Sequence, residues 1–173
     1  MSSLEAQHPV AFDELYRELI LDHYRHPRNQ GELPEPTVVA EGLNPSCGDE
    51  LRVAIKLADG AVSDIRFRGR GCSISQSSAS MMTEGVRGRS LAEVHALSDT
   101  VQEMLTNEDF DLDRADLGDL EALQGVVKFP VRIKCALLAW KVLEQAIADA
   151  TGGQVGADTD IQTRVAASAL HKE

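Results

Sequence analysis

The stretch from Leu51 to Phe67, LRVAIKLADGAVSDIRF, decides the fold class. In its first half, apolar residues alternate with other residues, as in a strand with one buried face: Leu51, Val53, Ile55 and Leu57. Asp59 and Gly60 then form a dipeptide typical of a tight hairpin turn, and a second alternating run covers 62–67. The stretch therefore predicts two antiparallel strands with one covered face.

The segments on either side of this hairpin extend it to an α+β fold. Residues 38–43 form a third predicted strand. Helices are predicted at 12–26, 73–86, about 90–105 and 130–149. Their limits follow from proline, a capping box and a glycine pair: Pro27, Ser90 with Glu93, Pro130 and Gly152 with Gly153. We expect a small antiparallel three-stranded sheet with helices packed on one face.

Two of these helices predict which side chains are buried. The helix over 12–26 carries one apolar stripe, formed by Phe12, Leu15, Tyr16, Leu19, Ile20 and His23. The final helix is apolar on two opposite faces, one with Ile133, Leu137, Trp140 and Ile147 and the other with Val131, Cys135, Leu138 and Val142. A helix that is apolar on two sides is enclosed by protein on two sides, so we expect Cys135 to point inward.

A chain of 173 residues is expected to form one domain. We expect a loose N-terminal lead over 1–11, the folded domain over 12–149 and a flexible tail over 150–173. Residues 103–121 hold eight acidic residues against one basic residue. We interpret this stretch as a solvated surface loop with a short helix, and a docking surface is the alternative.

The net charge of −11 argues against nucleic acid or an anionic membrane surface as a partner, because both would repel the chain. The longest uninterrupted apolar run, the six residues 135–140, is too short to span a membrane. The first residues lack the basic and apolar segments of a secretory signal. A cytoplasmic protein is therefore expected.

Three cysteines, Cys47, Cys72 and Cys135, are the chemically distinctive residues. Their odd number and the expected compartment argue against a disulfide framework. One interpretation is that they are small buried apolar side chains. The other is a metal site, because three thiols and the carboxylate of Asp49, two residues after Cys47, suit a tetrahedral Zn²⁺. Without a CxxC pair, spacing alone leaves both interpretations open.

Further residues bear on such a site. Arg132 lies one helical turn before Cys135, where a guanidinium favours the thiolate, although it could instead pair with a surface acid. His23 and His26 stand three residues apart on the first helix, a spacing that can bind a metal. We interpret His23 as part of the buried stripe and His26 as a cap at the helix C-terminus.

Four motifs follow one another in the chain: LYRELILDHYRHPRNQGEL (15–33), NPSCGDELRVAI (44–55), FRGRGCSISQSSASMM (67–82) and FPVRIKCALLAW (129–140). Together they resemble the U-type iron–sulfur cluster assembly proteins and imply a SufE/NifU-like fold. Two features resemble the SufU branch of zinc-dependent sulfurtransferases rather than the IscU-type scaffolds. Lys134 stands where IscU proteins carry a histidine before the last cysteine. SufU proteins carry an insertion between the second and third cysteines, and here 62 residues, 73–134, with the acidic stretch among them, separate Cys72 from Cys135.

This resemblance implies a Zn²⁺ held by Cys47, Asp49, Cys72 and Cys135. It also implies that Cys47 accepts sulfur from a PLP-dependent, SufS-type cysteine desulfurase, and that a downstream iron–sulfur scaffold complex receives that sulfur. Arg132 would assist Cys47 in catalysis by steadying negative charge. Two other hypotheses remain: an IscU-like scaffold that binds iron and carries a transient iron–sulfur cluster, and a zinc domain whose metal only holds the fold together.

Overall fold

Three consecutive strands form the antiparallel meander that the sequence predicts. In the computed structural model, which describes residues 2–153 and 161–169, these strands are β1 (Val38–Asn44), β2 (Asp49–Ala58) and β3 (Ala61–Arg70). Asp59 and Gly60 join β2 to β3 with φ angles of +54° and +75°. Two consecutive positive φ values match the twist of a two-residue hairpin, which explains the Asp-Gly pair.

A fourth strand, β4 (Gln162–Ser168), corrects the prediction of three strands. It pairs antiparallel with β1, so the strand order of the sheet is β3-β2-β1-β4. This strand lies in the segment for which a flexible tail was expected. Residues 154–160 and 170–173 of that segment lie outside the described residues.

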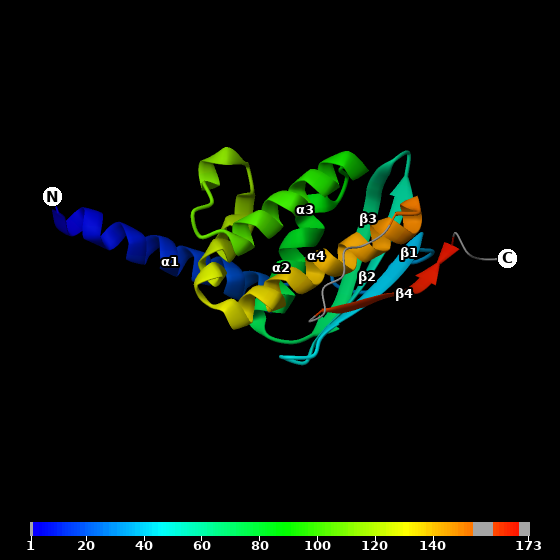
Figure 1. Cartoon of the computed structure of the whole chain (residues 1–173), viewed down its shortest axis with the longest axis horizontal. Coiled ribbons are helices and arrows are strands. Elements are labelled where there is room, and N and C mark those ends of the chain that lie inside the picture. The colour runs from blue at the N-terminus through cyan, green and yellow to red at the C-terminus, as the bar shows by residue number, and fades with distance from the viewer. Residues whose placement is uncertain (1, 154–160, 170–173) are drawn as a thin grey trace.

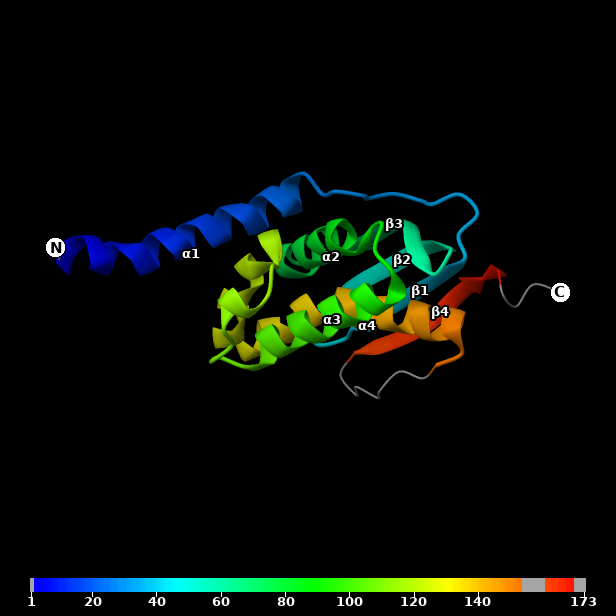
Figure 2. The same ribbon diagram turned by 90° about the horizontal axis from the view of Figure 1, so that it is seen from above.

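The helices are α1 (Ser2–Arg25), α2 (Ser73–Val86), α3 (Leu91–Thr106) and α4 (Pro130–Thr151), with two 3₁₀ segments, η1 (Leu112–Arg114) and η2 (Gly118–Lys128), in and after the acidic stretch. Helices α2 and α4 pack against one face of the sheet, as predicted for an α+β fold, and α1 and α3 pack on these helices and on η2 (Figures 1 and 2). The capping box of Ser90 and Glu93 is present at the start of α3. The first helix begins at Ser2, ten residues before the predicted start.

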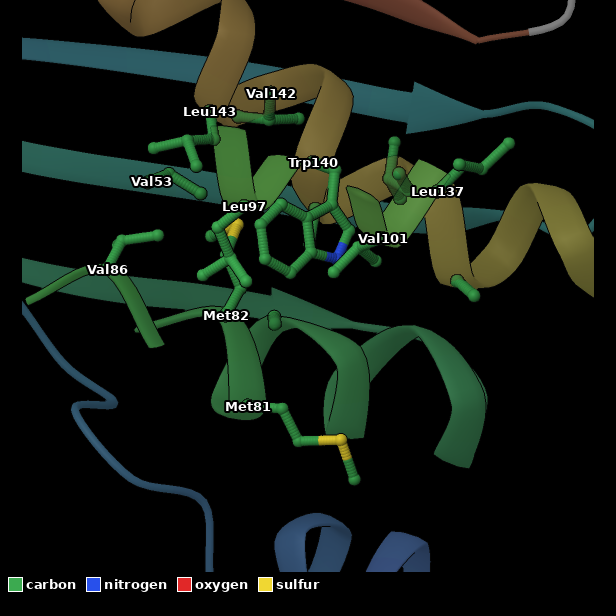
Figure 3. Packing of buried hydrophobic residues seen from close by; sticks show 14 of the residues in the cluster. Val53, Met81, Met82, Val86, Leu97, Val101, Leu137, Trp140, Val142 and Leu143 are labelled. Atoms are coloured by element: carbon green, nitrogen blue, oxygen red, sulfur yellow. The ribbon is translucent and has the colours of Figure 1, made fainter. Parts of the chain in front are cut away.

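The core lies between the sheet and the helices, around Trp140 of α4 (Figure 3). Both predicted faces of α4 are buried over most of its length, and Cys135, Leu138 and Trp140 are each 0% exposed. Its first turn differs, because Val131 is 68% exposed. The stripe of α1 is also incomplete: His23 is 0% exposed, whereas Leu15 is 54% exposed. No described helix is long and apolar enough to cross a membrane.

Candidate metal centre

The loop between β1 and β2 carries Cys47 and Asp49. The two strands pair as far as Asn44 and Asp49, and the backbone N–H groups of Cys47 and Gly48 donate to the carbonyl oxygen of Asn44 at 3.3 and 2.9 Å. Gly48 has a φ of +71°, a conformation that glycine adopts without strain. This turn leaves Cys47 exposed and Asp49 buried.

The junction between β3 and α2 carries Cys72. This residue is the N-cap of α2, and its Sγ accepts a hydrogen bond from the backbone N–H of Ser75 at 3.5 Å. Its own N–H donates to Oδ1 of Asp49 at 3.0 Å. A Cβ on Gly71 would lie 2.3 Å from that same oxygen, so the approach of the carboxylate requires glycine. The junction therefore places Cys72 directly beside the carboxylate of Asp49.

The third cysteine reaches the same place from α4. The Sγ of Cys135 lies 3.6 Å from the Sγ of Cys47 and 3.9 Å from Nδ2 of Asn44. Burial raises the pKa of the Cys135 thiol, and its neighbours Asp49 and Cys72 raise it further. The charges of Cys72 and Cys135 in turn raise the pKa of Arg132. Arg132 therefore faces these two thiols, and it makes no ion pair with an acid among the side chains that the structure describes, 14–153 and 161–169.

Three of the four predicted ligands form one group. The ligand atoms of Cys47, Asp49 and Cys135 all lie within 4.8 Å of one another. The Sγ of Cys72 is not part of that group, although the N–H of Cys72 binds Asp49 and its thiol faces Arg132 and Cys135. The assignment of these residues as ligands stays a prediction.

The donor set fits a zinc ion on physical grounds. Oδ2 of Asp49 is buried without a hydrogen-bond partner among the described residues, and a buried carboxylate that lacks a partner is unfavourable. A cation at this point would satisfy that oxygen. Thiolates select zinc or iron over magnesium and calcium, and zinc accepts a carboxylate as a further ligand.

Asn44 is a residue of this site that the sequence analysis did not single out. Its side chain is 0% exposed, its Nδ2 is directed at Cys135, and its Oδ1 has no partner in the described part of the chain. The Asn44-Pro45 dipeptide marks a turn. Turn chemistry alone does not reveal that the amide faces a cysteine 91 positions away.

A second cluster surrounds His23, which is buried as interpreted from the sequence. Its ring nitrogens lie 2.8 Å from Oγ of Ser80 and 2.9 Å from Oδ2 of Asp119. Glu84 completes a group whose ligand atoms are within 4.8 Å of one another. Arg28 lies 3.9 Å from Glu84. The cluster thus joins α1 to α2 and η2 through charged and hydrogen-bonded pairs.

The fold and the cysteine cluster define a class of protein. The model of the NifU-like N-terminal domain matches residues 15–136, and the chain therefore belongs to this family. It is 48% identical over 141 residues to the zinc-dependent sulfurtransferase SufU of Bacillus subtilis, a match that covers 82% of this chain and 95% of that protein.

Two further relatives are named as scaffolds. The iron–sulfur cluster assembly scaffold protein IscU of Thermotoga maritima is 38% identical over 138 residues, which cover 80% of this chain and 96% of that protein. Among solved structures, a scaffold protein for the SUF system from Fervidobacterium islandicum superposes with a TM-score of 0.70 at 33% identity, covering 75% of this chain and 94% of that one.

Proposed function

We propose that this chain is a zinc-dependent sulfurtransferase in iron–sulfur cluster assembly. It accepts sulfur from the persulfide of a SufS-type cysteine desulfurase and passes it to a downstream scaffold complex. The observation that carries the proposal is the position of Cys47, an exposed thiol 3.6 Å from a buried thiol in a carboxylate-containing cluster. The similarity to the SufU of Bacillus subtilis supports the same function. We expect the reaction to take place in the cytoplasm.

Cys47, Asp49, Cys72 and Cys135 would hold the zinc ion. When bound, zinc lowers the pKa of coordinated thiols, so that they are present as thiolates at neutral pH. Asp49 is the hard oxygen ligand among soft sulfurs. Burial of Cys135 and Asp49 keeps those two groups away from the partner, whereas Cys47 is open to it.

The transfer step exchanges one sulfur–sulfur bond for another. The Cys47 thiolate attacks the outer sulfur of the donor persulfide, and a bond forms between that sulfur and Sγ of Cys47. The donor's sulfur–sulfur bond breaks, and its electron pair leaves with the donor's cysteine thiolate. No external oxidant or reductant is needed. Arg132, which already faces Cys72 and Cys135, balances the negative charge that gathers during the exchange.

Replacing Cys47 by serine tests the proposal directly. We expect Cys47→Ser to abolish both the stimulation of alanine formation by the desulfurase and the persulfide that alkylation and mass spectrometry detect on the peptide containing residue 47. The fold should persist, because Cys47 is exposed and outside the core. Full stimulation by the variant, or a persulfide on Cys72 or Cys135 instead, would rule out Cys47 as the acceptor.

A scaffold on which a cluster is assembled is the second candidate, favoured by the 38% identity to the IscU of Thermotoga maritima. Metal analysis of protein purified without oxygen separates the two. One zinc per chain without visible absorption supports the sulfurtransferase. A brown protein that contains iron and sulfide supports the scaffold.

A further inference from the structure

A groove of about 550 Å³ lies between α1, η2 and the start of α4. Its apolar lining comes from three elements and includes Tyr16, Ile20, Ile74 and Val126. Phe129 lines one side and is 61% exposed, and Val131, two residues further on, is 68% exposed. These two side chains are among the few large apolar ones that the described residues expose strongly, which is typical of a binding surface.

The charge of this groove is opposite to that of the whole chain. Its lining contains Arg17, Lys128 and Arg132 and no acidic residue, although the chain carries a net charge of −11. Arg17 and Lys128 make no ion pair with another described side chain. The groove therefore favours a segment that combines an apolar side chain with negative charge.

One end of the groove reaches the cysteine cluster. Arg132 lines the groove and also faces Cys72 and Cys135, and Ser73, another lining residue, directly follows Cys72. A segment lying in the groove would thus bring its end to the thiols. The anionic sulfur of a persulfide would meet Arg132 first.

We propose that this groove binds the segment of the sulfur donor that carries the persulfide, with an apolar side chain in the groove and acidic groups against Lys128 and Arg17. The inference rests on the proposed function, and it adds the surface and the chemistry by which the donor is recognised. Binding in the groove precedes the chemical step. It therefore sets the concentration of this protein that half-saturates the donor, and it does not change the reaction rate of the bound pair.

The test is a titration of a SufS-type cysteine desulfurase, with cysteine as substrate, by this protein and its variants. Phe129→Ser and Lys128→Glu should each raise the half-saturating concentration roughly 10-fold and leave the rate at saturation nearly unchanged, because both change exposed groups of the groove and leave Arg132 and the four predicted zinc ligands in place. Tyr24→Ser and Lys56→Glu are the matched controls, since these side chains are exposed outside the groove and should not change the titration.

A second reaction separates failure of the groove from failure of the proposed function. A small persulfide, that of free cysteine, needs no groove and should load Cys47 of the wild type, Phe129→Ser and Lys128→Glu alike. If it does so while the groove variants titrate the desulfurase like the wild type, the groove proposal is wrong and the acceptor role stands. If neither donor loads Cys47, the proposed function fails. A change in the oligomeric state of Phe129→Ser without a change in the titration would assign the groove to a second copy of this chain.

Discussion

At the scale of single residues, Asp49 is the buried carboxylate of the cluster, and one of its oxygens still needs a partner. Its Oδ1 accepts the N–H of Cys72 and its Oδ2 is buried without a partner in the described part of the chain. We expect Asp49→Ala to weaken zinc binding at least roughly 10-fold. Even the loss of a residue that only hydrogen-bonds a metal ligand typically lowers metal affinity by about 10–100-fold. Competition with a chromogenic chelator measures the change.

Glu50→Ala is the control for this prediction, because Glu50 is the neighbouring carboxylate but is exposed and paired with Arg70. Its zinc affinity should equal that of the wild type. Unchanged zinc content and unchanged sulfur transfer in Asp49→Ala would remove Asp49 from the ligands.

The sequence predicts the inward direction of Cys135 but not the exposure of Val131, although both belong to the same predicted face of α4. The difference lies in what surrounds each turn of the helix. Cys135 faces the β1–β2 loop, whereas Val131, at the first turn, is left 68% exposed by the part of the chain that the structure describes. Helical periodicity gives the direction of a side chain and contains no information about where the covering element ends.

At the scale of elements, β4 shows the same limit for strands. Its half-buried residues, Thr163, Val165 and Ser168, have short side chains, so the segment lacks the strong apolar alternation of 51–57. An edge strand pairs with only one neighbouring strand, so its sequence shows a weaker apolar pattern than that of a central strand. The central meander has apolar residues that the core requires, and it was therefore predictable.

Glu41 of β1 lies opposite Arg164 of β4 and Arg52 of β2 and binds both. The hydrogen bond from Arg164, and then that from Arg52, lowers the pKa of Glu41 below its ordinary value of 4.5. A lowered pKa in the folded state contributes stability that is complete above the ordinary value and is lost as the pH falls through the lowered one. We therefore expect β4 to loosen in acid, by about 1 kcal/mol or less because Arg164 is exposed.

Hydrogen-exchange protection factors of β4 amides between pH 6 and pH 3 test this expectation. They should fall in acid more than those of β2 and β3, and Glu41→Gln should lower them already at pH 6. Glu50→Gln, which breaks the pair with Arg70 between β2 and β3, should leave β4 unchanged. Equal protection of β4 in the wild type and Glu41→Gln at both pH values would contradict the role of Glu41.

At the scale of the whole molecule, the cysteine cluster joins parts of the chain that are far apart in sequence. The β1–β2 loop, the β3–α2 junction and the first turns of α4 meet there, whereas the main core lies around Trp140. The sequence alone suggests which residue types meet. The meeting itself follows from the order of strands and from α4 packing on β1 and β2, which no local pattern contains.

This arrangement predicts what removal of the metal does. A ligand that binds only the folded state at 1,000 times its Kd adds about 4 kcal/mol, and for a chain of this length that raises the Tm by roughly 10 °C. A chelator should therefore lower the Tm by about this amount, and zinc but not magnesium should restore it. The helical circular dichroism at 25 °C should persist, because the core between the sheet and the helices does not include the cluster. An unchanged Tm would mean that the chain has no resident metal, whereas complete unfolding would favour a zinc ion that only holds the fold together.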